Sequence, residues 1–288
     1  MDENNSSRIP LGNTGLEVSR LITAAWSFAG RKGPLGGRIQ PEDIERSLHE
    51  LGINSFFVTP KMKDAAEGVR RLIRSGHREK MVIISVMGVP LPRMVGAYWR
   101  RCTRALELDT IDILLMGWVQ YRYYLRPSVW DAMQKLKESG QVRAIGFSIH
   151  NRKLAARLAN QLDPAPDVLM LRYNAAHRGA ETEVFNRLPE PKPGVMAYTA
   201  TRWGDLLKPR PELGFEKGMT APECYRFALM HPAVDTALCG ARTFAELQED
   251  MEGIADGPLS EERYREVVSF GDAVHSKPTH RGTRYAWR

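Results

Sequence analysis

The chain contains few cysteines and no long apolar run. Its cysteines, Cys102, Cys224 and Cys239, are odd in number and widely separated, which argues against a disulfide framework and against the ligand spacing of a metal centre. Aliphatic runs such as 82–86 and 113–116 have only the length of a strand, so no membrane-spanning helix is expected. The start, Met-Asp-Glu-Asn-Asn-Ser-Ser, is polar and acidic, unlike a signal peptide. These absences favour a reduced, cytoplasmic protein that contacts no membrane and needs no metal.

Positive charge exceeds negative charge, with 41 Lys and Arg against 34 Asp and Glu. Such an excess can indicate a polyanionic partner. The pairs Arg70-Arg71 and Arg100-Arg101 lie on expected helices, where they are typical of a solvated face. The basic, aromatic segment 277–288 is the better candidate for a polyanion or lid contact. No basic-aromatic recognition module is present, so nucleic acid is not expected as a partner and a small molecule is. The oligomeric state stays open.

Short β-branched or aliphatic segments alternate with helical patterns along the chain. The expected strands are 21–25, 54–58, 81–86, 111–116, 143–148, 167–171, 194–198 and 235–239. Eight strand-helix units in 288 residues predict an α/β fold, a closed (β/α)₈ TIM barrel in a single domain. We expect a β-hairpin at about 8–19, the barrel at about 21–254, and a C-terminal helix with a basic tail within 258–288.

In such a barrel, chemistry belongs to the loops at the carboxyl ends of the strands. That rule selects a set of candidate residues from periodicity alone. They are Trp26, Phe28, Thr59 to Lys63, Met87, Gly117 to Tyr124, His150, Asn151, Arg172 to His177, Tyr198 to Trp203, and Arg242.

Three motifs resemble those of the aldo-keto reductases. The segment 52–59 (GINSFFVT) resembles that family's "GINxFDT", 82–86 (VIISV) lies where the family has "viatK", and 111–118 (IDILLMGW) is similar to "iDlllHw". The resemblance extends from Ile9 to Asp250. It implies a barrel of the aldo-keto reductase type, plugged at its base by the hairpin.

The resemblance also implies four catalytic positions, an Asp, a Tyr, a Lys and a His. In this chain those positions are assigned to Val58, Lys63, Val86 and Gly117. The family's Tyr protonates the carbonyl oxygen, and such a proton donor contributes a factor of roughly 10²–10⁴ in rate. We therefore do not expect carbonyl reduction by the usual mechanism.

The resemblance implies NADP(H) as the candidate cofactor, with a site that is only partly retained. Of the family's Ser-Asn pair and Gln that hold the nicotinamide amide, Ser148 remains, whereas Ile149 and Met170 replace the other two. Tyr198 matches the residue that stacks on the nicotinamide ring. The expected pyrophosphate and 2′-phosphate ligands are Thr199, Arg202, Gly204, Leu206, Gly240, Arg242, Glu246 and Asp250.

Substitute catalytic groups are available at the expected mouth. Lys63 could act as a base or form a Schiff base, or it could be a solvated loop lysine. His150 and Tyr121 are the other catalytic candidates. The substrate pocket is expected from Trp26, Phe28, Trp118, Tyr123, Tyr124, Arg172 and Asn174, with the alternative that the aromatic residues only pack against the barrel rim.

Three functions remain open from the sequence. The first is an enzyme with altered chemistry of the lyase, isomerase, cyclisation or carbonyl-condensation type, in which Lys63 and His150 take part. The second is an NADP(H)-dependent oxidoreductase with substitute acid groups. The third is a pseudoenzyme that binds a ligand without turning it over.

Overall fold

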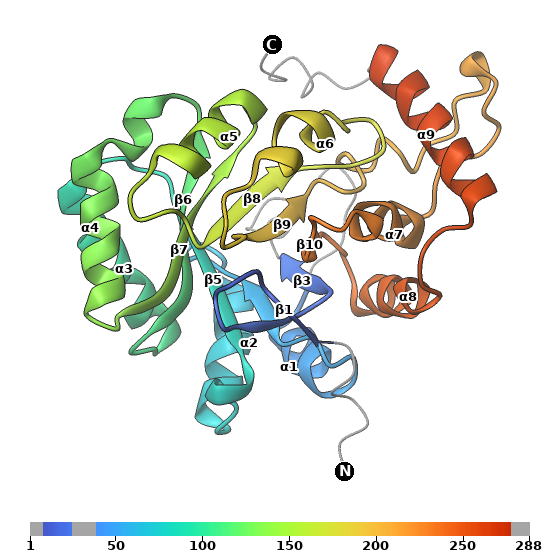
Figure 1. Ribbon diagram of the computed structural model, residues 1–288. Helices are drawn as coiled ribbons and strands as arrows, with labels where there is room; N and C mark the ends of the chain where they lie inside the picture. The colour runs from blue at the N-terminus through green and yellow to red at the C-terminus, as the bar shows by residue number, and fades with distance from the viewer. Residues whose placement is uncertain (1–7, 25–38, 278–288) are drawn as a thin grey trace.

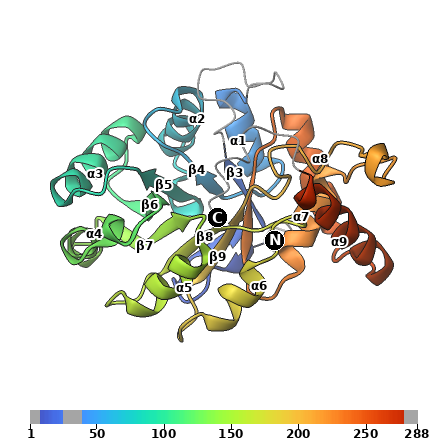
Figure 2. The ribbon, with the colours of Figure 1, turned by 90° about the horizontal axis from the view of Figure 1, so that it is seen from above.

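The computed structural model describes residues 8–24 and 39–277. Its centre is a closed barrel of parallel strands in the order β10-β3-β4-β5-β6-β7-β8-β9, surrounded by helices (Figures 1 and 2). The barrel strands are β3 (Leu21–Ala24), β4 (Ser55–Phe57), β5 (Val82–Met87), β6 (Ile111–Val119), β7 (Val142–Ile149), β8 (Val168–Arg172), β9 (Gly194–Tyr198) and β10 (Thr236–Cys239). All eight expected strands and the barrel itself are confirmed.

Alternation along each strand separates an inner from an outer apolar layer. Ile84 and Val86 of β5 lie in the interior cluster with Leu115 of β6. Ile83, which precedes Ile84 on β5, packs outward against the helices. Successive side chains of a strand point to opposite faces, so each strand has one set of residues filling the barrel and another anchoring a helix.

The helices form the outer ring. They are α1 (Pro41–His49), α2 (Lys63–Arg74), α3 (Pro92–Leu106), α4 (Pro127–Glu138), α5 (Arg152–Gln161), α6 (Ala180–Glu183), α7 (Ala221–Met230), α8 (Phe244–Ala255) and α9 (Glu261–Ser276). Short 3₁₀ helices are η3 (Arg78–Lys80), η4 (Arg122–Leu125), η5 (Phe185–Arg187) and η6 (Pro211–Leu213). The expected C-terminal helix is confirmed as α9. Within the described ranges, no helix is long and apolar enough to cross a membrane.

A hairpin of β1 (Arg8–Pro10) and β2 (Glu17–Ser19) plugs the base of the barrel, as expected. Leu11 and Val18 belong to the interior cluster. Asn54 ties the hairpin to β4: its Oδ1 accepts from the Ser19 backbone N–H (2.8 Å) and its Nδ2 donates to the Glu17 carbonyl (2.9 Å). The amino end of the barrel is thereby closed, which leaves the carboxyl end for a site.

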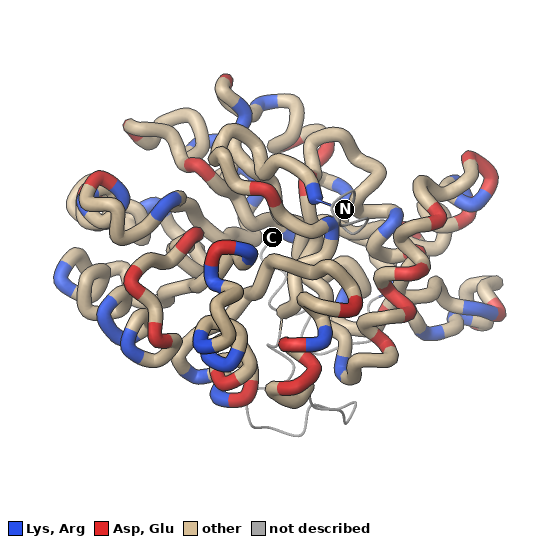
Figure 3. Tube along the Cα trace, turned by 90° about the horizontal axis from the view of Figure 1, so that it is seen from below, with Lys and Arg blue, Asp and Glu red and all other residues tan. Residues whose placement is uncertain are grey.

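Lys and Arg alternate with Asp and Glu around the outer helices (Figure 3). Several of them form surface ion pairs, such as Arg46 with Glu50 and Arg74 with Glu107. Exposed pairs of this kind contribute little to stability, typically about 0–1 kcal/mol. They do explain why the pairs of neighbouring arginines are compatible with an ordinary solvated surface.

Candidate active site

Three residues form an apolar layer at the carboxyl ends of β4, β5 and β6, here called the mouth layer: Phe57, Val86 and Gly117. Phe57 and Val86 are 1% and 4% exposed and belong to the interior cluster. A Cβ placed on Gly117 would lie 2.4 Å from the Val86 Cγ2 atom. The side chain of Val86 thus occupies the space that any side chain at 117 would need.

The assignment of Val58 and Lys63 requires a correction. Val58 lies in the outer cluster with Met62, whereas Phe57, one residue earlier, faces the barrel interior. The interior position at the end of β4 is therefore Phe57, and the same five-residue spacing reaches the buried Met62 instead of Lys63. Lys63 is an exposed first residue of α2, and within the described part of the chain no contact joins it to His150. This placement favours the solvated-lysine alternative.

The strand β6 ends in an irregular segment that carries the aromatic candidates. Its pairing with β7 shifts register between Met116 and Val119, and Trp118 has a φ of 53°. The Trp118 ring covers Gly88, where an added Cβ would lie 2.9 Å from its Cζ3 atom. A left-handed conformation costs a non-glycine residue of order 1–2 kcal/mol, so the tertiary contacts of Trp118 hold it in this position.

The tyrosines after β6 form a surface stack. The rings of Tyr121 and Tyr123 stack at 5.7 Å, and those of Tyr123 and Tyr124 are 5.0 Å apart. Tyr121 and Tyr123 are each 52% exposed, whereas Tyr124 packs against the core. This arrangement gives the hydroxyl of Tyr121 no partner inside the barrel and suits the rim-packing alternative.

His150 and Tyr198 come together at the ends of β7 and β9. Their rings meet edge to face at 5.2 Å, and the Tyr198 hydroxyl donates to the Ile149 carbonyl at 3.3 Å. Ser148 also hydrogen-bonds the Tyr198 side chain. Among the residues that the structure describes, the buried Nδ1 atom of His150 has no hydrogen-bond partner. Burial, and secondly the charge of Arg172, lower the pKa of His150 to about 4, so its imidazole is neutral at physiological pH.

Asn174 organises the loop after β8. It donates from Nδ2 to the Thr199 carbonyl (2.7 Å), and its Oδ1 accepts from the Ala176 backbone N–H (3.1 Å). That oxygen also contacts the His177 Nδ1 at 3.2 Å. Asn174 is 1% exposed, so it acts as an internal brace between two loops instead of lining a substrate pocket as expected.

The loop after β9 is held in an unusual backbone conformation. Thr199, Arg202 and Trp203 have φ values of 58°, 52° and 54°. Gly204 also has a positive φ and donates to the Thr201 Oγ1 at 3.3 Å, while Leu206 is fully buried. The Arg202 guanidinium is 2% exposed and lies 3.7 Å from the Asp205 carboxylate. An arginine expected to meet a pyrophosphate thus points into the protein.

In the segment after β10, the arginine at 242 already has a carboxylate partner. The Glu246 carboxylate accepts from the Arg242 backbone N–H at 2.7 Å and from the guanidinium Nε at 2.9 Å. Asp250 is 3% exposed and accepts from the Cys239 thiol at 3.3 Å. The Gly240 backbone N–H donates to the Tyr225 hydroxyl at 3.2 Å. Two carboxylates therefore lie at the positions expected to receive a 2′-phosphate.

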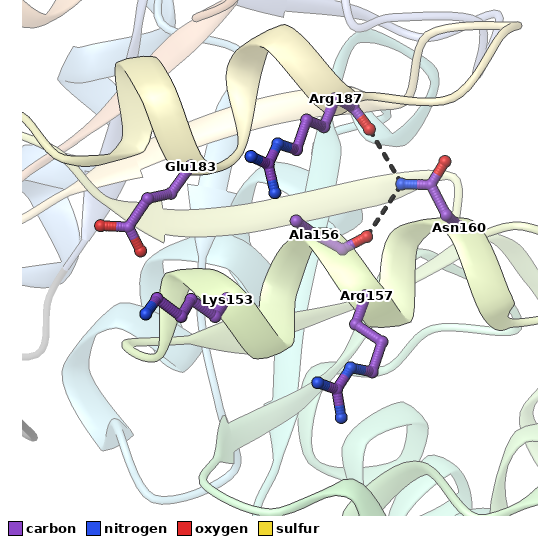
Figure 4. A pocket seen from close by; sticks show the side chains of 6 residues that line it. All are labelled: Lys153, Ala156, Arg157, Asn160, Glu183 and Arg187. Atoms are coloured by element: carbon purple, nitrogen blue, oxygen red, sulfur yellow. Dashed lines mark hydrogen bonds between the residues drawn. The ribbon is translucent and has the colours of Figure 1, made fainter.

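Several expected features fall elsewhere. Trp26 and Phe28 lie outside the described residues, as does nearly all of the basic tail. In the ranges that the structure describes, no group of three His, Cys, Asp or Glu could hold a metal ion. A surface hollow between α5 and α6, lined by Lys153, Arg157, Asn160, Glu183 and Arg187, is on the outside of the barrel (Figure 4).

Comparison with known proteins agrees with this geometry. Residues 61–210, more than half of the chain, match the model of the aldo/keto reductase family. The chain belongs to this family. No curated protein matches it in sequence.

The fold is shared with solved aldo-keto reductases. The apo form of AKR11C1 from Bacillus halodurans has 18% sequence identity and a TM-score of 0.73, and the match covers 96% of this chain and 99% of that one. Its holo form has 19% sequence identity and a TM-score of 0.74, with the same coverage of both chains. At these identities the likeness shows the barrel and not the reaction.

Members of this family generally bind NADP(H), and the residues present here do not fit that cofactor as the family holds it. At the nicotinamide end, the Ile149 side chain packs in the outer core and Met170 is apolar. At the 2′-phosphate end, Arg242 is engaged by Glu246, which a phosphate would have to displace against like-charge repulsion. Tyr198 and Ser148 are the residues expected to contact the nicotinamide that this chain retains.

Proposed function

We propose that this protein is a barrel enzyme that works without the family's Asp-Tyr-Lys-His machinery and moves a proton on a small organic substrate, with His150 as the proton acceptor. The reaction belongs to the non-redox, isomerase or lyase type. The observation that carries the proposal is the position of His150, a partly buried imidazole at the barrel mouth with an unpartnered Nδ1.

The mouth layer supports this choice over carbonyl reduction. Phe57, Val86 and Gly117 offer no group that could donate a proton or lower the pKa of a neighbouring tyrosine. Tyr198 cannot replace the missing acid easily, since burial raises its pKa and its hydroxyl already donates to the Ile149 carbonyl. His150 remains as the group that can accept a proton, because its imidazole is neutral.

The step balances without an oxidant or a reductant. The C–H bond next to a carbonyl breaks, its proton moves to the imidazole, and the electron pair passes through a new C=C bond to the carbonyl oxygen. Return of a proton to the same carbon completes an exchange. In an α-hydroxy ketone the intermediate is an enediol, and protonation of the former carbonyl carbon with loss of the proton from the other hydroxyl completes an isomerisation. A low pKa makes His150 a weak base in the free protein, and a bound anion would weaken the effect of Arg172 and raise that pKa.

Solvent exchange provides the test. The purified protein is incubated in D₂O with a panel of small 2-oxo acids and neutral ketones, and loss of the C–H signal next to each carbonyl is followed by NMR. We expect exchange above the buffer rate, and a loss of roughly 10²-fold or more in His150→Gln with an unchanged thermal melt. The control is His49→Gln on the outer helix α1, which is expected to keep the wild-type rate.

Three outcomes would contradict the proposal. Exchange at the wild-type rate in His150→Gln removes the assigned base. Oxidation of NADPH coupled to reduction of a panel compound, without exchange, would establish the oxidoreductase alternative instead. A protein that binds panel compounds but neither exchanges nor reduces them would fit the pseudoenzyme alternative.

A further inference from the structure

Arg172 is a buried cation at the barrel mouth that has no anionic partner among the described residues. It is the last residue of β8, and Met170, two residues earlier, lies in the interior cluster, so the Arg172 side chain starts toward the barrel interior. The residue is 7% exposed. Within residues 8–24 and 39–277, its guanidinium forms no hydrogen bond and no ion pair with any carboxylate.

Neighbouring positive charges add to the excess of positive charge at Arg172. Burial is the main cause that lowers its pKa, and the charges of Arg152 and Arg202 lower it further. Each of those arginines lies near a carboxylate, since Arg152 pairs with Glu183 at 2.9 Å and Arg202 lies 3.7 Å from Asp205, which Arg210 also contacts at 2.6 Å. No Asp or Glu offsets the charge of Arg172 in the same way. A buried charge without a partner is strongly destabilising, so the free protein carries a cost that a bound anion would relieve.

We propose that Arg172 anchors an anionic group of the substrate, a carboxylate or a phosphate, at the mouth of the barrel. This inference rests on the proposed function and names its substrate class, a small organic acid or phosphate ester. The guanidinium fork matches both oxyanions in a bidentate manner. An anion held there would lie in the same electrostatic neighbourhood as His150, whose pKa responds to the charge of Arg172.

Binding of a substrate anion by Arg172 would also favour the proton transfer proposed for His150. The carboxylate of a 2-oxo acid is bonded directly to its carbonyl carbon, so binding of the acid by Arg172 would bring the carbon that loses the proton close to the anchor. Neutralisation of the Arg172 charge would also raise the pKa of His150 at the moment when a base is needed. A neutral ketone would obtain neither effect.

Calorimetry with defined probes tests the anchor. The full-length protein is titrated in low-chloride buffer with oxalate, with pyruvate and with inorganic phosphate, which separates a carboxylate site from a phosphate site. We expect at least one of the three probes to bind, and Arg172→Met to weaken binding roughly 10- to 100-fold. The control is Arg187→Gln, since Arg187 is exposed on the outer surface and its loss should leave binding unchanged.

Thermal stability of the free protein gives a second, independent measurement. Removal of an unpartnered buried charge should raise the melting temperature of Arg172→Met, whereas a structural arginine would lower it when replaced. In wild type, oxalate or phosphate should raise the melting temperature and this increase should vanish in the variant. Binding of all probes by Arg172→Met with wild-type affinity, or no binding of any probe to wild type, would overturn the anchor.

The two proposals can fail separately. Oxalate binding that depends on Arg172, without any solvent exchange on the panel, keeps the anchor and removes the proton-transfer function. Exchange on 2-oxo acids that is unchanged in Arg172→Met keeps the function and removes the anchor.

Discussion

Val86 and Gly117 occupy one space at the ends of β5 and β6, and this arrangement can be tested by a pair of substitutions. Because a Cβ at 117 would lie 2.4 Å from Val86 Cγ2, we expect Gly117→Ala to destabilise the fold by about 1–3 kcal/mol through overpacking. Val86→Ala opens a cavity and should also destabilise it. The double variant should cost less than the two single changes together by on the order of 1 kcal/mol.

Urea unfolding of the four proteins measures this coupling. Strictly additive free energies of unfolding would mean that the two residues do not share the space. The catalytic proposal would be unaffected by that result, since it depends on His150.

The sequence located the mouth residues well but not the directions of their side chains. Gly117, His150, Arg172 and Tyr198 were expected at the mouth, and the structure places all four at the carboxyl ends of barrel strands. The position assigned to Val58 belongs to Phe57, a shift of one residue that exchanges the interior for the outer layer. Strict alternation counted along 55–57 could have found this.

Pairings over long sequence distances could not be foreseen in the same way. The bond from Asn174 to the Thr199 carbonyl links two loops that are brought together only when the barrel closes. The unpartnered state of Arg172 is likewise a property of the fold, because it depends on where every nearby carboxylate lies. Sequence reasoning therefore named Arg172 as a candidate but could not separate a buried ligand anchor from an exposed arginine.

Helix α9 packs closely on the loop that carries Asn174 and His177. A Cβ at Gly271 would lie 2.3 Å from the Ala175 carbonyl oxygen, and the rings of His177 and His275 meet at 5.2 Å. We expect Gly271→Ala to lower the free energy of unfolding by about 1–3 kcal/mol, despite the better helix propensity of alanine, because a backbone oxygen cannot yield as a flexible side chain can.

Ser269 supplies a matched control on the same helix. It is exposed, so Ser269→Ala should stay within about 0.5 kcal/mol of wild type. Denaturant unfolding and the NMR signals of His177 and His275 are the measurements. A Gly271→Ala variant as stable as Ser269→Ala, with unchanged histidine signals, would show that α9 is not held by this contact.

The strands and helices were easier to predict than the side-chain contacts that hold them in place. Each strand is a short aliphatic run, and the hairpin and α9 carry local turn and helix signals, so all were expected. Helix α1 belongs to the first of the eight expected strand-helix units, although no bounds were predicted for it, and the crossover that contains it includes the undescribed residues 25–38.

The stability of the whole molecule should depend on pH through Asp250. Burial raises the pKa of this carboxyl to about 7, against 3.8 for an ordinary Asp. Between these values the folded state holds a proton that the unfolded state has lost, so the contribution of Asp250 to the free energy of unfolding should fall as the pH rises from about 4 to 7 and then level off. Asp250→Asn should remove this loss and be more stable than wild type at pH 8, with little difference near pH 4.

Glu252 is an exposed residue of α8 that does not contribute to the raised pKa of Asp250, and it provides the control. Glu252→Gln should keep the pH dependence of wild type. Urea unfolding at pH 4.5 and pH 8 distinguishes the variants, and an Asp250→Asn protein that is no more stable at pH 8 would contradict the expected titration. His177 contributes with the opposite sign, because burial lowers its pKa to about 2 whereas the unfolded chain takes up a proton below about 6.5, so this part of the stability is lost as the pH falls below about 6.5.

The shared space of Val86 and Gly117 also limits the mutational routes open to this protein. A histidine introduced at 117 collides with Val86, and a lysine introduced at 86 would extend a charged chain into the apolar mouth layer with no carboxylate at 57 to receive it. Under the proposed function, each single step toward the family's residues at this mouth would therefore pass through a less stable protein. Selection acting one substitution at a time would then preserve the present mouth, and acquisition of those residues would require several changes to arise together.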